Sequence, residues 1–367
     1  MHTPRISALR GLTVLALGLA ALSLSAQHYQ QTNLVADQMG VAPATDTNLV
    51  NPWGLSRSSS SPWWVSDNGT GLATLYDGTG AARSLVVTVP TGDPSSSSTG
   101  TPTGTVFNGG TGFTLAPHTP ALFLFVTEDG TVSGWNPGVN ATNAVIKVNT
   151  KSASVFKGMA LATINLPFTG ASTFLYAADF RKGHIQVYDS SFHHVPAMES
   201  LFDDSQLPPG HAPFNIQNIG GELYVTFAQQ DGAKHDEVDG PGKGYVDVFS
   251  PLGFLLRRME HGPWLNGPWG LALASGDFGV YSHDLLVGQF GSGKIAVYDP
   301  VTGRFRGVLR DASNNPITID GLWGLSFGSG SGSGSATALY FSAGSDGESH
   351  GLFGTITPVE NTLGNSQ

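Results

Sequence analysis

One segment of the sequence gathers an unusual number of titratable side chains. Between Gln229 and Gly244 it holds four carboxylates and one histidine, in the order Asp231, His235, Asp236, Glu237 and Asp239. A histidine beside carboxylates can act as a metal ligand or as a general base with a raised pKa. The acids lack the alternating spacing of an EF-hand loop, so we do not interpret the segment as one. The plainer alternative, a solvated acidic loop, stays open.

Oxygen-bearing side chains also recur at similar places elsewhere in the chain. Four of them stand where apolar strands begin: Asn51, Asn215, Asn266 and Asp320. Three carboxylates come where strands end: Asp67, Glu128 and Asp179. Calcium prefers such oxygen ligands, so the first four are candidate ligands of Ca²⁺. The last three, with His235, Asp236, Glu237 and Asp239, are candidates for binding a ligand. Asn and Asp also cap turns, which is the competing explanation.

These residues can meet only if the fold brings them together, and internal repeats indicate how. The segments Pro52 to Leu55, Pro268 to Leu271 and Leu322 to Leu325 share the pattern x-Trp-Gly-Leu. Weaker copies begin at Phe156 and Pro213, and we place a sixth near Thr111 to Phe113. The period of about 50 residues is typical of four-stranded propeller blades. We interpret Thr91 to Thr105 and Gly328 to Ser335 as loops, and the repeated Trp as a packing residue rather than a ligand platform.

The two ends of the repeat array predict how the ring closes. The last module runs out after Gly351 to Pro358, whereas Asn33 to Asp37 forms an apolar strand ahead of the first module. We therefore expect the N-terminal strand to complete the last blade, which removes exposed sheet edges. The chain is then an all-β, six-bladed propeller. In that ring, the starts of the inner strands and the turns between second and third strands share one channel mouth.

The N-terminus and the composition indicate where the protein is located and which partners it can have. Residues 1–26 have the basic start, apolar stretch and small residues of a signal peptide, which leaves residues 27–367 as a single exported domain, periplasmic or extracellular. No later stretch is long and apolar enough to predict a membrane span. The chain has no Cys, and its formal net charge is −10. That charge makes nucleic acid an unlikely partner, and we expect a monomer.

The chain resembles a family of uncharacterised bacterial secreted propeller proteins, some of which carry an exosortase sorting tail. The resemblance rests on Asn48 to Leu55, Lys234 to Val238 and Leu265 to Ala272. It implies an NHL-like propeller and export, without a known activity. The last residues, 361–367, lack a sorting motif, so we do not expect surface anchoring by that route.

Two functions follow from these observations, and the sequence leaves open whether the protein is an enzyme. The first is a non-catalytic binding or scaffold module, whose channel mouth holds a small molecule, a glycan or a protein. The alternative is a calcium-dependent hydrolase or lyase, similar to lactonase propellers. In that alternative, Asn51, Asn215, Asn266 and Asp320 hold Ca²⁺, and a carboxylate or His235 acts as the base. No other cofactor is indicated.

Overall fold

The computed structural model describes residues 28–359, apart from 94, 96–97 and 167–169. These described residues form one compact unit. The predicted signal peptide and the C-terminal residues 360–367 lie outside the described residues, so export and the missing sorting motif stay predictions. No helix in the described part of the chain has the length and apolar character needed to cross a membrane.

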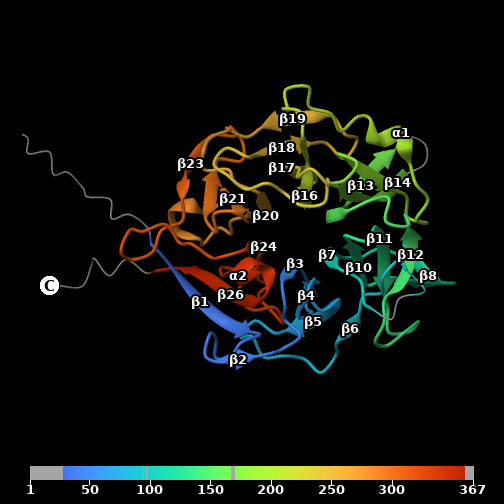
Figure 1. Ribbon diagram of the computed structural model, residues 1–367, viewed down its shortest axis with the longest axis horizontal. Helices are drawn as coiled ribbons and strands as arrows, with labels where there is room; N and C mark the ends of the chain where they lie inside the picture. Colours follow the sequence, from blue (N-terminus) through green and yellow to red (C-terminus); the bar gives the residue numbers. More distant parts are fainter. Residues whose placement is uncertain (1–27, 94, 96–97, 167–169, 360–367) are drawn as a thin grey trace, which may run out of the picture. The chain divides into compact units, whose positions relative to one another are not determined.

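Six sheets stand around a central axis as the blades of a propeller (Figure 1), which confirms the predicted architecture. From the axis outwards, blade 1 contains β3 (Pro52–Ser56), β4 (Trp63–Asp67), β5 (Leu72–Tyr76) and β6 (Val87–Thr88). In the same direction, blade 2 contains β7 (Pro102–Phe107), β10 (Phe123–Thr127), β11 (Thr131–Trp135) and β12 (Val145–Asn149). Blade 3 contains β13 (Phe156–Leu166), β14 (Gly170–Asp179) and β15 (His184–Tyr188).

The second half of the ring follows the same plan. Blade 4 contains β16 (His211–Ile219), β17 (Glu222–Gln229), β18 (Gly244–Phe249) and β19 (Leu255–Arg258). Blade 5 contains β20 (Pro268–Leu273), β21 (Leu285–Gln289), β22 (Ile295–Tyr298) and β23 (Phe305–Val308). Blade 6 contains β24 (Leu322–Phe327), β25 (Leu339–Ala343), β26 (Leu352–Pro358), β1 (Tyr29–Ala36) and β2 (Ala44–Thr45). The short elements β8 (Thr114–Ala116), β9 (Thr119–Pro120), α1 (Pro196–Glu199), η1 (Gly279–Tyr281) and α2 (Ser345–Glu348) lie in connections.

The N-terminal strand closes the ring as expected. β1 pairs antiparallel with β26, from Tyr29 opposite Pro358 to Ala36 opposite Leu352, and the two strands lie side by side in Figure 1. Val35 pairs with Phe353 and is 1% exposed. Blade 6 is therefore built from segments at opposite ends of the chain, and β1 covers the edge that β26 would otherwise expose.

The hydrophobic core is divided among the spaces between blades. Buried side chains form one cluster between each pair of neighbouring blades and one more on the axis. Alternation along a strand explains this division, because successive side chains point to opposite faces. Trp63 packs on Tyr340 of blade 6, while the next residue, Trp64, stacks on Phe123 of blade 2. The middle strands, such as β4 and β10, are thus buried on both faces.

Glycine in the repeat lets neighbouring inner strands approach around the axis. A Cβ on Gly54 would lie 2.5 Å from the carbonyl oxygen of Thr103, and one on Gly324 would lie 2.6 Å from that of Trp53. Gly104, Gly158 and Gly270 meet the next blade in the same way. In blade 4 the equivalent residue is Asn215, whose amide donates to the carbonyl of Trp269 at 2.8 Å. A close contact between neighbouring inner strands is therefore present in all six blades.

The start of the second module is where the sequence prediction is wrong. We expected it near Thr111 to Phe113, with Thr91 to Thr105 as a loop. The inner strand of blade 2 is instead β7, Pro102–Phe107, and residues 111–113 belong to the connection towards β10. The pattern Pro102-Thr103-Gly104 keeps the glycine but has Thr where three other modules have Trp. Gly328 to Ser335 is a loop between β24 and β25, as predicted.

Candidate functional site

The axial position of the repeat is the residue immediately before the close-approach Gly or Asn. Around the ring it is occupied by Trp53, Thr103, Lys157, Phe214, Trp269 and Trp323. Trp53 and Trp323 stack with ring centroids 3.5 Å apart, and Trp269 meets both edge-on at 5.9 and 5.8 Å. Their exposed fractions are 4% or less, so these rings fill the channel as packing residues. The aromatic cluster forms the floor of the mouth above it.

Lys157 is the exception at the axial position, because its side chain is charged and only 1% exposed. Its ammonium lies 2.5 Å from Glu128 Oε1 and 3.2 Å from Asp236 Oδ1, and 5.0 Å from the ring centre of Trp53. Burial alone would lower the pKa of Lys157, but attraction from Glu128, Glu237 and Asp236 outweighs it and raises the pKa. The lysine is therefore held as a cation between carboxylates and an aromatic ring.

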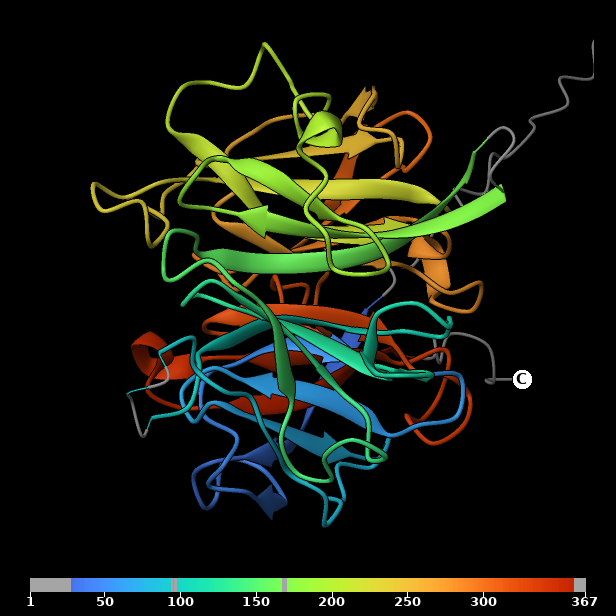
Figure 2. The ribbon, with the colours of Figure 1, turned by 90° about the vertical axis from the view of Figure 1, so that its right-hand side faces the viewer.

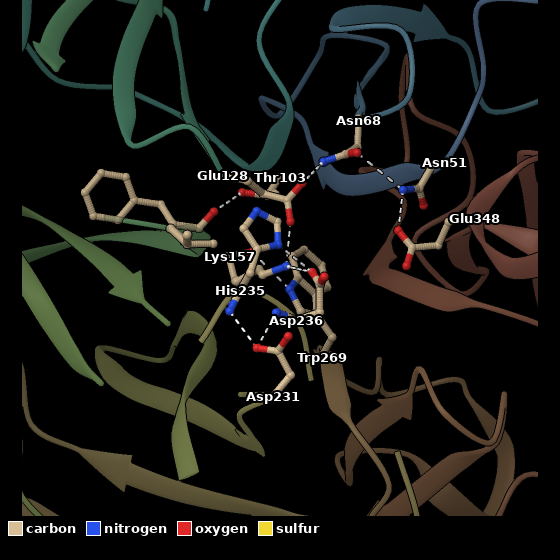
Figure 3. A network of polar contacts seen from close by, with 12 residues as sticks. Asn51, Asn68, Thr103, Glu128, Lys157, Asp231, His235, Asp236, Trp269 and Glu348 are labelled. Carbon is tan, nitrogen blue, oxygen red and sulfur yellow. Dashed lines mark hydrogen bonds and ion pairs between the residues drawn. The ribbon is translucent and has the colours of Figure 1, made fainter. Parts of the chain in front are cut away.

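The contacts of Lys157 extend across the mouth into blades 1 and 6 (Figure 3). The second oxygen of Glu128 accepts a hydrogen bond from Asn68 Nδ2 at 2.7 Å. Asn51 Nδ2 donates to Asn68 Oδ1 at 3.4 Å and to Glu348 Oε2 at 2.6 Å. Asn51 Oδ1 accepts from the indole of Trp323 at 3.0 Å. Side chains from opposite ends of the sequence thus share one network.

The acidic loop of blade 4 supplies the other end of this network. His235 Nδ1 lies 2.8 Å from Asp236 Oδ1, the same oxygen that contacts Lys157. Asp231 accepts from the backbone N–H of His235 at 2.8 Å, which fixes the loop there. The loop and α2 lie on the same side of the propeller in Figure 2. We call the seven connected side chains the mouth network: Asn51, Asn68, Glu128, Lys157, His235, Asp236 and Glu348.

The pKa values of the carboxyl groups at the mouth are shifted in opposite directions. Burial raises the pKa of Glu237 to about 8, and Asp239 and Glu348 add to the rise while Lys157 opposes it. Burial likewise raises the pKa of Glu348. Burial would raise the pKa of Asp236 too, but Lys157 and His235 together lower it. Near neutral pH, Glu237 therefore keeps its proton, whereas Asp236 is ionised.

Two residues of the network have an unfavourable backbone conformation. Asn51 has φ of 47° and Glu348 has φ of 68°, in the left-handed region. Asn tolerates this region, whereas it costs a Glu about 1 kcal/mol or more. The same two residues hydrogen-bond each other, so the strain is located at the mouth.

The structure brings together only part of the predicted ligand site. Glu128, His235 and Asp236 belong to the mouth network, and Glu237 interacts with Lys157. Asp239 lies over blade 5, near Gly267 and Gly291. Asp67 and Asp179 are instead 0% exposed. Asp67 accepts from the backbone of Thr74 and Asp179 from Gln186, so these two carboxyls serve their own hairpins.

The four predicted calcium ligands each have a separate partner. Asn266 Oδ1 accepts from the backbone of Gly240 at 2.6 Å, and Asp320 Oδ2 from that of Asp346 at 2.8 Å. The oxygen of Asn51 is bonded to Trp323, and that of Asn215 lies against Gly158. Glu128, His235 and Asp236 offer ligand atoms within 4.8 Å of one another, but the ammonium of Lys157 contacts two of them. The donor set therefore does not fit a resident metal ion, and Ca²⁺ stays an untested prediction.

Sequence reasoning missed Glu348 and gave Lys157 no role as a site residue. Glu348 lies between the second and third strands of blade 6, the same kind of turn that supplied Glu128. Applying that rule to the last module would have identified it. Lys157 occupies the axial position of the repeat, and a charged residue at a position otherwise filled by Trp, Phe or Thr was the available signal.

Comparisons with known proteins agree with the fold and leave the role open. Solved structures with a similar fold include a streptogramin B lyase, with a TM-score of 0.50 at 11% identity over 91% of this chain and 98% of that one. A glucose dehydrogenase gives a TM-score of 0.53 at 12% identity over 91% of this chain and 100% of that one. At such identities the likeness shows the propeller fold alone. No family model matches the sequence.

Clear relatives occur in Acanthamoeba polyphaga mimivirus. Its uncharacterised protein L690 is 32% identical over 334 residues, which covers 88% of this chain and 84% of the relative. Its uncharacterised protein R648 is 31% identical over 332 residues, covering 88% and 78%. These relatives are viral, so the comparisons support the propeller part of the expected resemblance and not its bacterial part. The chain belongs to the same protein family as these two mimivirus proteins.

Proposed function

We propose that the protein is a binding module whose mouth network holds a small ligand with a positively charged nitrogen. One observation carries the proposal: Glu128, Asp236, Glu237 and Glu348 are gathered around the ammonium of Lys157. Carboxylates in excess over cations attract a further cation. Burial is the main cause of the raised pKa values of Glu237 and Glu348, and neighbouring carboxylates add to both.

Binding of a cation should release a proton. With a pKa of about 8, Glu237 is mostly protonated at pH 7. A cation placed beside it favours the ionised form and lowers this pKa. The ligand would therefore bind more tightly as pH rises towards 8, and the released proton would pass to the buffer.

The test is calorimetric titration with agmatine and n-butylammonium, and with 1-butanol as the uncharged comparison. We expect the two cations to bind and butanol not to. The binding enthalpy at pH 7 should differ between phosphate and Tris buffers because of the released proton. Glu348→Gln should weaken binding about tenfold, since the removed charge faces the ligand. Asp277→Asn, at an exposed position away from the mouth, is the matched control. Equal binding of butanol and butylammonium would contradict the proposal.

A second candidate is acid–base hydrolysis or elimination, and the His235–Asp236 pair favours it. Asp236 holds His235 through Nδ1, and Nε2 makes no hydrogen bond within the described residues, so it is available as a base. This candidate differs from the calcium-dependent hydrolase or lyase that the sequence suggested, because Lys157 rather than Ca²⁺ supplies the positive charge at the mouth. A screen of lactones and esters, with calcium and with chelator, tests it. Turnover that His235→Gln abolishes and chelator does not affect would replace the binding proposal.

A further inference from the structure

The opposite end of the channel contains a cavity of about 320 Å³, and no residue of the mouth network lines it. The inner strands run away from the mouth network, so the residues at their far ends surround this opening. Five blades contribute to its wall, through residues such as Ser56, Phe107, Leu161, Gln217 and Ser326. We call it the far cavity. Its volume lies at the lower end of the range for small-molecule sites, which suits a ligand of about one ring.

The far cavity is separate from the mouth network. Between the two lie the stacked rings of Trp53 and Trp323 and then a constriction of about 20 Å³, lined by Leu55, Met159 and Leu271 among others. That volume has room for about one water molecule. A ligand in the far cavity could therefore not touch Lys157 or Glu128.

The charge of the far cavity is opposite to that of the mouth. Arg57 is the one charged residue among those lining it, and no carboxylate is present there. No carboxylate in the described part of the chain forms an ion pair with Arg57. Its Nε and Nη2 donate to the carbonyls of Phe327 and Gly328 at 2.7 and 3.1 Å, which leaves other N–H groups of the guanidinium unused. Its Cζ also lies 5.6 Å from the ring centre of Trp63. Burial lowers the pKa of Arg57.

An unpartnered, buried hydroxyl also belongs to the wall of this part of the channel. Thr105 is 7% exposed, and its Oγ1 has no hydrogen-bond partner among the described residues. Thr105 lines both the far cavity and the constriction. A buried hydroxyl without a partner is unfavourable, so a ligand that bonds to it removes that cost. Ser56, Ser326 and the exposed residue Gln217 add further hydrogen-bonding groups to the wall of the cavity.

We propose that the far cavity is a second binding site, for a small hydroxylated carboxylate such as a sugar acid. The carboxylate pairs with Arg57, whose planar guanidinium suits it. The hydroxyls of the ligand bond to Thr105, Ser56, Ser326 and Gln217. The apolar side chains of Leu55, Met159 and Leu161 face the ring of the ligand.

The experiment is calorimetric or NMR titration of the whole protein with D-glucuronate, D-glucose and acetate. We expect glucuronate to bind at least tenfold more tightly than either of the others, because only it carries both groups. Thr105→Val keeps the shape and removes the hydroxyl, so it should weaken glucuronate about tenfold while leaving the fold intact. Gln217→Glu places a carboxylate at an exposed position on the wall and should abolish glucuronate binding without affecting the core.

Two controls separate this site from the mouth and from damage to the fold. Glu348→Gln should leave glucuronate binding unchanged, and agmatine binding should survive Gln217→Glu. Arg57→Gln should abolish glucuronate binding, and if that variant fails to fold, Gln217→Glu still decides. Equal affinity for glucose and glucuronate, no binding of glucuronate at tens of millimolar, or full binding by Gln217→Glu would each overturn the proposal.

Discussion

Glu237 gives the sharpest quantitative prediction, because its carboxyl is destabilised by the site in which it lies. Its pKa rises from the ordinary 4.5 to about 8 on folding, through burial and through Asp239 and Glu348. The folded chain therefore binds more protons than the unfolded chain between these two values. Stability must fall as pH rises through this window, by about 1.4 kcal/mol per pH unit for one proton. The full effect at pH 9 is up to about 5 kcal/mol.

Glu237→Gln removes this cost and keeps the shape of the side chain. We expect the variant and the parent to have similar stability at pH 4.5, where both side chains are neutral in the folded protein. At pH 9 the variant should be more stable by about 3–5 kcal/mol, because its neutral amide does not have to ionise in the buried site. The groups facing Glu237 are Lys157, Asp239 and Glu348, and all three remain in the variant.

Urea unfolding of both proteins from pH 4.5 to 9 measures this difference. Asp247 has the same pKa of about 8 for a related reason, burial beside Asp204, and it adds a second proton to the pH dependence of both proteins. Only the difference between parent and variant therefore isolates Glu237. A difference that does not change with pH would refute the assignment of a raised pKa to this residue.

Three further substitutions test the packing around the axis and the closure of the ring. Lys157→Met leaves Glu128 and Asp236 without their cation. It should lower the free energy of unfolding, measured with urea, by about 3–5 kcal/mol at pH 7 and by less at pH 4. Lys294→Met, at an exposed position, should change this free energy little. Gly324→Ala places a Cβ 2.6 Å from the carbonyl of Trp53 and should cost about 2–4 kcal/mol in the same assay; a loss below about 0.5 kcal/mol would show that the inner strands can move apart. Val35→Asp should lower the free energy of unfolding by about 3 kcal/mol or more and expose the edge of β26. We expect the exposed edge to cause aggregation, which size-exclusion chromatography measures. Val41→Asp, at a residue that is 45% exposed, should cause neither effect.

The fold could be predicted well from the sequence because the fold repeats. Closure by the N-terminal strand followed from a missing strand at one end and a spare one at the other, and Val35 opposite Phe353 confirms it. The second module was misplaced because Thr111 to Phe113 and Pro102 to Gly104 both contain a glycine and neither contains the repeated Trp. Gly104 is needed where β7 meets Gly158 and Met159 of the next blade, but Thr103 suffices before it.

The candidate site was harder to predict because it depends on side-chain contacts across the ring. Position in the repeat correctly suggested that Glu128 and Asp236 face the same mouth. It could not show that Lys157 lies between them, nor that Asp67 and Asp179 turn inwards to bond within their own hairpins. Residue types that bind cations also satisfy backbone donors, and sequence alone does not distinguish the two uses. The far cavity gave no sequence signal, since its wall combines strand ends from five blades.

The separation of the two channel ends follows from the same repeat that builds the ring. Each close-approach glycine draws neighbouring inner strands together, so the side chains directed to the axis have little space there. At the axial position, aromatic rings fill that space; two residues further along, Leu55, Thr105 and Met159 narrow it again. The channel is thereby divided, which allows carboxylates to accumulate at one end and Arg57 to stand without an acidic partner at the other. In an open channel the carboxylates and Arg57 would interact through water, and neither the raised pKa of Glu237 nor the lowered pKa of Arg57 could persist to the same degree.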